Sequence, residues 1–421
     1  MNKYYQQGLV ELAAGHLEQA AAAFTDGVKH YPRDIYAYNK LAFVFRELGQ
    51  YQKAVRILRA AMKVKPNDLF TRYILGNTYL DEGHYREALA EFQEALRIEP
   101  KDSYTLNSLA LTYKLMRDYD RAVETLKKAI GLDAKDAYSH NSLAQVLVEL
   151  GRHDEALSVL RRAMDASPDN ALVHSSLGQL YLQLGDQDRA RDRFEYLIRQ
   201  HPSSKLGHQG MGQLELAQGH HQQALNHFQR AVNLDPQDGS LVGFVGQSYR
   251  ELGDLEAAER QYEHALRLDP RSATTLAALG EVYERQGLVL KAWNSYQEAI
   301  QADPDSSYLH YLLGRLYINQ KLYAKAEAEL RLAAALDPAD VYSQNSLGFL
   351  KLLAGDFKQA QTIFRTVLAV QPEDEYALLH LAKSLLGDQR PQEARMFLNR
   401  VIEMGSKAQF FQQASELAGA L

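Results

Sequence analysis

The sequence predicts an all-α protein built as a solenoid of helical hairpins. Three observations predict it: self-similarity with a period of 34 residues, prolines spaced at that period, and apolar residues at helical spacing within each copy. A fixed period of this length is typical of solenoids, in which each repeat packs mainly on its neighbours. Ten of the eleven prolines follow the period, at Pro32, Pro66, Pro100, Pro168, Pro202, Pro236, Pro270, Pro304, Pro338 and Pro372.

Twelve copies of the 34-residue unit fill residues 1–408. We expect them to span 1–34, 35–68, 69–102, 103–136, 137–170, 171–204, 205–238, 239–272, 273–306, 307–340, 341–374 and 375–408. The remaining residues, 409–421, have the pattern of a short amphipathic helix. We expect this C-terminal helix to cap the last hydrophobic face, as terminal elements of solenoids do.

Five positions, numbered 1 to 34 within each copy, show how one copy folds. Position 20 is alanine in all twelve copies, position 8 is glycine or alanine, and position 24 is large and apolar or aromatic. Position 15 is glycine in nine copies, and position 32 is usually proline. Glycine in a left-handed conformation ends a helix, and proline stops the next one. Each copy is therefore predicted to be a helix, a tight turn and an antiparallel helix.

This pattern resembles the tetratricopeptide repeat (TPR). The positions that carry the resemblance are a small residue at 8, Tyr at 11, Gly at 15, Ala at 20, Phe at 24 and Pro at 32. The resemblance covers residues 1–408. It implies a right-handed superhelix whose first helices line a concave groove. It also implies a non-enzymatic scaffold or adaptor that binds other proteins. The family's tryptophan at position 4 is replaced here by residues such as Tyr38 and His140.

The sequence offers no room and no motif for an enzyme. The copies leave 13 residues, too few for a catalytic domain, and the chain has no cysteine. It has no phosphate-binding loop, no HExxH motif and no EF-hand loop. Five histidines fall between residues 201 and 227, but their spacing does not bring them to one point, as a metal site requires. We therefore expect no catalytic residue, no metal and no cofactor.

Charge and hydropathy argue against nucleic acid and membrane as partners. The net charge is −6, whereas phosphate binding needs a basic face. No apolar run reaches the roughly 18 residues that a membrane-spanning helix needs. The first seven residues lack the apolar core of a signal peptide. We expect a cytoplasmic protein that does not insert into membranes.

Position 2 is aromatic in seven copies, and side-chain amides recur at positions 5 and 9. The resemblance places these positions in the groove. Amides pair with the N–H and C=O groups of an extended chain, and tyrosine adds large contact area at low entropy cost. We therefore predict that the groove binds a protein or an extended peptide. The candidate residues are Tyr36, Asn39, Phe70, Asn77, Tyr104, Asn107, Tyr138, Asn141, Gln145, Gln179, Gln213, Gln247, Tyr308, Tyr342, Asn345 and Tyr376.

Several alternatives stay open at this point. The position-2 aromatic residues could instead pack on the preceding copy, and the glutamines could form a solvated polar face. Leu288, Leu290 and Trp293 form an apolar group at the start of a second helix, which suits either local packing or contact with a partner. The protein could thus be a self-assembling structural protein. It could also be a substrate-recruiting arm of a larger enzyme or assembly machine.

Glycines inside two predicted first helices are unusual. Gly207, Gly210, Gly239 and Gly243 each replace residues that favour helices more strongly. An interior glycine costs about 1 kcal/mol relative to alanine. Two explanations are open: a hinge in this part of the chain, or helices that approach each other closely.

Overall fold

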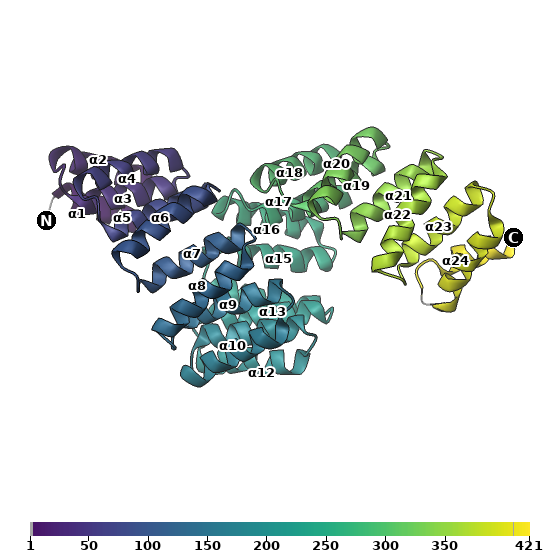
Figure 1. Cartoon of the computed structure of the whole chain (residues 1–421), viewed down its shortest axis with the longest axis horizontal. Coiled ribbons are helices and arrows are strands. Elements are labelled where there is room, and N and C mark those ends of the chain that lie inside the picture. The colour runs from purple at the N-terminus through teal and green to yellow at the C-terminus, as the bar shows by residue number, and fades with distance from the viewer. Residues whose placement is uncertain (1–2, 407) are drawn as a thin grey trace. The chain divides into compact units, whose positions relative to one another are not determined.

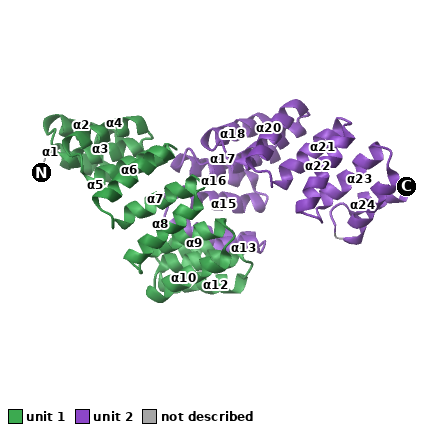
Figure 2. Cartoon of the chain, viewed as in Figure 1, with its two compact units in different colours: residues 1–210 green, residues 211–421 purple. Residues whose placement is uncertain are grey.

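The computed structural model describes residues 3–406 and 408–421. Within them the chain forms 25 α-helices and no strand, which confirms the predicted all-α solenoid. Residues 1 and 2 of the first predicted copy and residue 407 of the last copy lie outside the described residues. The chain divides into two compact units, residues 1–210 and 211–421 (Figures 1 and 2). The prediction of one continuous superhelix stays a prediction.

Unit 1 consists of consecutive helix pairs, each joined by a short turn, in which the odd-numbered helix comes first. Within it α3 packs on α4, α4 packs on α5, and the successive first helices α3 and α5 also meet. The helices are α1 (Lys3–Ala13), α2 (Leu17–His30), α3 (Ile35–Glu47), α4 (Tyr51–Val64), α5 (Leu69–Asp81), α6 (Tyr85–Ile98), α7 (Ser103–Leu115), α8 (Tyr119–Leu132), α9 (Ala137–Glu149), α10 (His153–Ala166), α11 (Ala171–Gln183) and α12 (Gln187–Gln200).

Unit 2 continues the same alternation, and the boundary between the units falls within α13 (Lys205–Ala217). Its further helices are α14 (His221–Leu234), α15 (Gly239–Glu251), α16 (Leu255–Leu268), α17 (Ala273–Arg285), α18 (Val289–Ala302), α19 (Ser307–Asn319), α20 (Tyr323–Leu336), α21 (Val341–Leu353), α22 (Phe357–Val370), α23 (Glu375–Gly387), α24 (Pro391–Glu403) and α25 (Phe411–Gly419). The last of these, α25, packs on α24 and buries Ala414 and Ala418.

The turn inside each hairpin has the same backbone conformation whether or not it contains glycine. The nine glycines at position 15 have φ between 68° and 84°. Arg117, Lys321 and Gln389 occupy position 15 in the other three copies, and each has φ 59°. The surrounding helices therefore impose a left-handed residue here even where the side chain disfavours it.

The first helices begin at a side-chain cap that the sequence analysis did not use. Position 34 is usually aspartate, and its carboxylate accepts hydrogen bonds from backbone N–H groups of the next helix. Asp34, for example, accepts from the N–H groups of Tyr36 and Ala37 at the start of α3. Such caps satisfy N–H groups that the helix itself leaves unpaired.

A close contact within each hairpin joins position 8 of the first helix to position 24 of the second. In seven hairpins position 8 is glycine and position 24 is Phe or Tyr, and a Cβ added to the glycine would lie 2.4–2.9 Å from the ring. These pairs are Gly8 with Phe24, Gly76 with Phe92, Gly178 with Phe194, Gly212 with Phe228, Gly246 with Tyr262, Gly280 with Tyr296, and Gly348 with Phe364.

Where position 8 is alanine, position 24 is always leucine. These pairs are Ala42 with Leu58, Ala110 with Leu126, Ala144 with Leu160, and Ala382 with Leu398. The remaining hairpin combines Gly314 with Leu330. The side-chain volumes at the two positions thus compensate each other: a larger residue on one helix accompanies a smaller one on the other.

The unusual glycines of α13 make close contacts. A Cβ at Gly207 would lie 2.9 Å from Ile198, and one at Gly210 would lie 2.2 Å from the ring of Phe194. At Gly243 the nearest atom would be 3.8 Å away, so close packing does not account for that glycine. Of the two explanations, close approach of helices therefore holds for Gly207 and Gly210.

The first prediction concerns the glycine–aromatic contact. Gly76→Ala should lower the free energy of unfolding by about 1–3 kcal/mol, because the new methyl group overlaps Phe92. Adding Phe92→Leu should recover part of that loss, since it recreates the Ala–Leu pair of other hairpins. Urea unfolding of the two single variants and the double variant measures the coupling.

Gly131→Ala is the matched control, because nothing lies within 4 Å of a Cβ at this helical glycine. It should raise stability by up to about 1 kcal/mol. If the changes in unfolding free energy caused by Gly76→Ala and Phe92→Leu were additive in the double variant, the proposed compensation of side-chain volumes would be wrong.

The second prediction concerns the left-handed turn at Arg117, whose φ is 59°. Arg117→Gly should stabilise the protein, because a non-glycine residue in this region costs roughly 1–2 kcal/mol. The larger entropy of glycine in the unfolded chain offsets part of this, leaving a net gain of about 1 kcal/mol or less. Thermal unfolding measures it. Arg117→Ala keeps the unfavourable φ and should give no gain, so an equal gain in both variants would show that φ is not the cause.

Candidate functional site

Six of the seven aromatic residues at position 2 project into solvent from the start of their first helices. Tyr104 is 74% exposed, and each of the other five is more than half exposed. The exposed set is Tyr36, Phe70, Tyr104, Tyr138, Tyr308 and Tyr342. Tyr376, the seventh, is partly buried and meets Phe410 edge-on with ring centroids 5.9 Å apart. Two of the six also contact the preceding hairpin, since the Tyr308 hydroxyl donates to Glu281 and the Tyr342 ring lies 6.1 Å from that of Tyr311. Packing and contact with a partner therefore both stay open for position 2.

The asparagines at position 5 link neighbouring first helices in unit 1. The Thr71 hydroxyl donates to Asn39 Oδ1 at 3.0 Å, and the Ser139 hydroxyl donates to Asn107 Oδ1 at 3.0 Å. Asn141 Oδ1 accepts from the Ser176 hydroxyl at 2.5 Å. The sequence analysis missed this role. The signal was available, because a hydroxyl residue stands at position 3 or 6 of the copy that follows.

Asn345 is the position-5 amide of unit 2 among the predicted residues. It is 8% exposed, and its Nδ2 donates to Asp374 Oδ1 at 3.2 Å. Asp374 also caps α23, where it accepts from the N–H of Ala377. This amide too connects two consecutive first helices, α21 and α23.

The amides at position 9 remain open to a ligand. No hydrogen bond within the described residues uses the side chain of Gln145, Gln179, Gln213 or Gln247, and Gln145 is exposed. Asn77 differs, since its Nδ2 donates to the Tyr73 carbonyl at 3.1 Å. Gln145 and Gln179 line one hollow of about 220 Å³ in unit 1. Contact of these amides with a peptide stays a prediction.

Three hollows follow the first helices of unit 2. The first, of about 390 Å³, is lined by Gln247 and Arg250. The second, of about 180 Å³, is lined by Arg250 and Tyr308. The third, of about 1050 Å³, is lined by Tyr342, Asn345 and Tyr376 among others. The structure thus brings five predicted residues of unit 2 to hollows on the first helices, whereas Gln213 lines none of these three.

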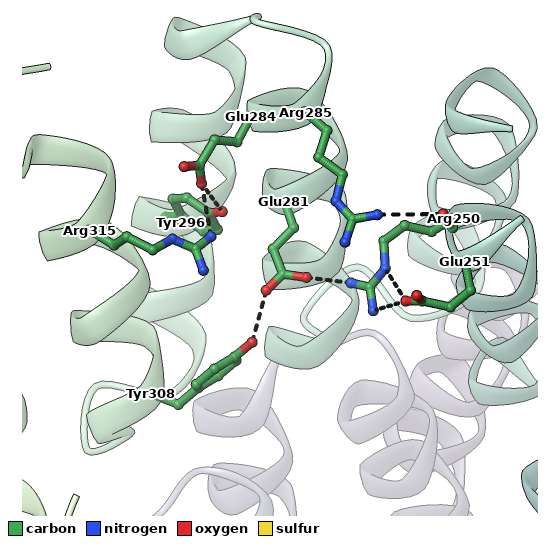
Figure 3. A network of polar contacts seen from close by, with 8 residues as sticks. All are labelled: Arg250, Glu251, Glu281, Glu284, Arg285, Tyr296, Tyr308 and Arg315. Atoms are coloured by element: carbon green, nitrogen blue, oxygen red, sulfur yellow. Dashed lines mark hydrogen bonds and ion pairs between the residues drawn. The ribbon is translucent and has the colours of Figure 1, made fainter. Parts of the chain in front are cut away.

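A charged network joins α15, α17 and α19 on the same surface (Figure 3). The Arg250 guanidinium donates to Glu281, whose other oxygen accepts from the Tyr308 hydroxyl at 2.9 Å. Glu284 accepts from Arg315 at 3.0 Å. Sequence analysis did not identify this pairing, because the partners lie in successive copies about one repeat apart.

The network makes ionisation of Tyr308 less favourable than that of an ordinary tyrosine. Although about half of the Tyr308 side chain is exposed, partial burial, reinforced by the neighbouring Glu281 carboxylate, raises the pKa of Tyr308 to about 12. Burial and the Glu284 carboxylate likewise raise the pKa of Tyr296. These phenols therefore act as hydrogen-bond donors to carboxylates throughout the physiological pH range.

The apolar group on α18 is exposed. Leu290 is 79% exposed, and Leu288 and Trp293 are also exposed. The Trp293 Nε1–H donates to the Tyr317 hydroxyl at 2.8 Å, so the indole is held in place by the next hairpin. Contact of this group with a partner stays a prediction.

Residues 3–406 and 408–421 hold no group of three or more His, Cys, Asp or Glu side chains placed to bind a metal ion. One of the clustered histidines, His220, instead lies 2.8 Å from Glu215. Over the same residues, no helix combines the length and apolar character that crossing a membrane requires.

Together these features define an α-solenoid of helical hairpins that presents exposed aromatic side chains and hollows on its first helices. The chain belongs to the tetratricopeptide repeat family. Sequence profiles described as tetratricopeptide repeat match residues 5–68, 37–101, 147–214, 206–238, 285–345 and 351–411, and one described as TPR repeat matches residues 246–287. Members of this family are protein-interaction scaffolds. A profile for anaphase-promoting complex, cyclosome, subunit 3, matches residues 92–163.

Solved structures are similar to the chain at low sequence identity. The chain is similar to one in the crystal structure of the APC/C hetero-tetramer Cut9-Hcn1, with 16% identity and a TM-score of 0.54 over 99% of this chain and 95% of that one. It is also similar to a tetratricopeptide repeat protein from Parabacteroides merdae, with 16% identity and a TM-score of 0.47 over 58% of this chain and 97% of that one. No curated protein sequence matches the chain.

His380 forms the buried base of the aromatic group beside Tyr376. Its ring stacks on Tyr376 with centroids 3.9 Å apart, and its Nδ1–H donates to the Tyr376 carbonyl at 2.8 Å. Burial lowers the pKa of His380 to about 4, and nearby Lys383 acts in the same direction. The folded protein therefore holds this imidazole neutral.

The third prediction follows from that pKa. Above pH 6.5 His380 is neutral in both folded and unfolded chains, so it does not affect stability. As the pH falls from about 6.5 to about 4, the unfolded chain binds a proton that the folded chain does not, and stability is lost. The loss should reach about 3 kcal/mol at most. Urea unfolding as a function of pH should show a shallower slope for His380→Gln; an unchanged slope would contradict the assignment.

Proposed function

We propose that this protein is a non-enzymatic scaffold that holds an extended segment of a partner protein along its first helices. The observation that carries the proposal is the set of exposed aromatic residues at position 2, two of which, Tyr308 and Tyr342, line hollows. A folded protein rarely exposes so many large rings on one repeated position without using them. Tyrosine suits such a surface, because it contributes a large contact area while few rotatable bonds must be fixed.

The links between hairpins support the same function. Within unit 1, Arg46 pairs with Asp81 at 2.7 Å and Lys114 pairs with Glu149 at 2.8 Å, each across consecutive first helices. With the asparagine–hydroxyl bonds, these pairs join the consecutive first helices that carry the aromatic side chains. A surface that is ordered before binding loses less entropy when a flexible peptide docks on it.

The fourth prediction tests the aromatic row. Peptides selected from a displayed random library on the full wild-type chain should bind a Tyr104→Ser, Tyr138→Ser, Tyr342→Ser variant at least about tenfold more weakly, because each buried aromatic contact contributes about 1 kcal/mol. Fluorescence anisotropy of the labelled selected peptides measures the affinity, and circular dichroism confirms that the variants fold.

A matched control replaces exposed residues of second helices. Leu332→Ser, Tyr323→Ser and Met396→Ser remove exposed large side chains from α20 and α24 and should change affinity by less than about twofold. Equal losses in both variants would contradict a site on the first helices. A chain that selects no peptide but sediments as larger species at high concentration would instead favour self-association through Leu288, Leu290 and Trp293.

A further inference from the structure

We infer that the hollow of unit 2 lined by Tyr342, Asn345 and Tyr376 binds a cationic side chain of the partner segment, with arginine preferred over lysine. This inference rests on the proposed function and adds the chemistry of one subsite. The hollow measures about 1050 Å³ and lies between α19, α21 and α23, with Phe410 from the segment before α25 at its edge. Its aromatic walls, its carboxylates and one buried amide each favour a cation.

The walls of the hollow are rich in aromatic rings. Tyr311 and Tyr342 lie with ring centroids 6.1 Å apart, and Tyr376 meets Phe410 edge-on at 5.9 Å. Phe349 also lines the hollow. A cation over the face of such rings is attracted by their negative quadrupole, and a guanidinium can also stack on them as a plane.

Three consecutive carboxylates, Glu373, Asp374 and Glu375, line the same hollow. Within the described residues, none of these three carboxylates forms an ion pair. The Oε2 atom of Glu375 is buried and has no hydrogen-bond partner there. The one cation among the lining residues is Arg315, and Glu284 already neutralises it at 3.0 Å. The hollow therefore carries unbalanced negative charge.

This charge distinguishes cations from other ligands. An acidic segment would be repelled, and an apolar side chain would remove the carboxylates from water without a partner, which costs free energy. In unit 1 the hollow lined by Lys114 and Glu149 differs, because those two residues pair with each other at 2.8 Å. That hollow offers no net charge from its ionised lining residues and serves as an internal comparison.

The buried amide of Asn345 supplies an independent observation. In unit 1 the equivalent oxygens of Asn39 and Asn107 accept from Thr71 and Ser139, which stand at position 3 of the following copy. At the corresponding place in unit 2 that residue is Ala377.

Asn345 Oδ1 consequently has no hydrogen-bond donor, although the side chain is only 8% exposed and lines the hollow. Its Nδ2 is turned toward Asp374, which leaves the oxygen as an acceptor. An unpaired buried acceptor favours a ligand that brings N–H donors. A guanidinium carries five such donors in a planar fork, whereas an ammonium carries three on a single point.

The test begins with the random peptide library displayed to the full wild-type chain and to a Glu373→Gln, Glu375→Gln variant. Asp374 is left unchanged because it caps α23. Peptides selected on the wild type should be enriched in arginine relative to the unselected library, and the enrichment should disappear on the variant. Binders that lack any cationic enrichment would overturn this inference and leave the proposed function standing. Failure to select any binder would overturn both.

A selected peptide and copies with arginine replaced by lysine, norleucine or glutamate then give the affinities. The glutamine variant should bind the arginine peptide about tenfold more weakly and the norleucine peptide equally well. Glu149→Gln, in the hollow of unit 1, should change neither affinity. An equal loss for the arginine and norleucine peptides would show that the carboxylates only support the fold.

Ala377→Ser provides a second variant that conserves the fold, since serine or threonine stands at the same position in other copies. Its hydroxyl should donate to Asn345 Oδ1, as Ser139 does to Asn107. We expect unchanged or higher resistance to urea, together with severalfold weaker binding of the arginine peptide and unchanged binding of the norleucine peptide. Stronger or unaltered binding of the arginine peptide would overturn the role assigned to Asn345.

Discussion

The contact between positions 8 and 24 determines how closely the two helices of a hairpin approach. Phe92 is fully buried against Gly76, and leucine at position 24 accompanies alanine at position 8 in other hairpins. Together with the invariant, fully buried alanine at position 20, this contact packs the two helices closely. Every other feature of the solenoid depends on it, because hairpins of equal geometry can stack with the same residues facing one another in each step.

In the stacked hairpins the first helix has two roles: some of its positions join consecutive helices, and position 2 carries exposed side chains. Its positions 3 and 5 join consecutive helices through buried hydrogen bonds such as that between Thr71 and Asn39, and its positions 9, 12 and 13 join them through ion pairs such as that between Lys114 and Glu149. Position 2 takes part in few of these links, and its aromatic side chains remain exposed. The helices that carry the exposed rings are thus joined by other residues, so the fold does not depend on the rings. The rings can therefore be substituted to suit a different ligand without loss of the fold.

The repeat made the fold predictable from sequence, because a pattern that recurs twelve times removes the ambiguity of any single helix. It predicted the left-handed residue at position 15 for nine glycines but not for Arg117, Lys321 and Gln389, where the neighbouring helices decide the conformation. It predicted amides at position 5 without their role. Asn39 finds its partner 32 residues along the chain, so the role becomes visible only when the register between consecutive copies is known.

In a repeat protein a departure from the pattern carries more information than the pattern itself. The bond that joins Asn107 to Ser139 is absent at Asn345, because Ala377 replaces the hydroxyl residue, and this occurs where three carboxylates and several aromatic rings meet. Periodicity predicts what all copies share, namely helices, turns and links between hairpins. It cannot predict a subsite that differs from copy to copy, since such a site depends on which side chains of successive hairpins face the same space. A buried acceptor without a donor lowers stability, so the place where the link is missing is also the place where a ligand has most to add.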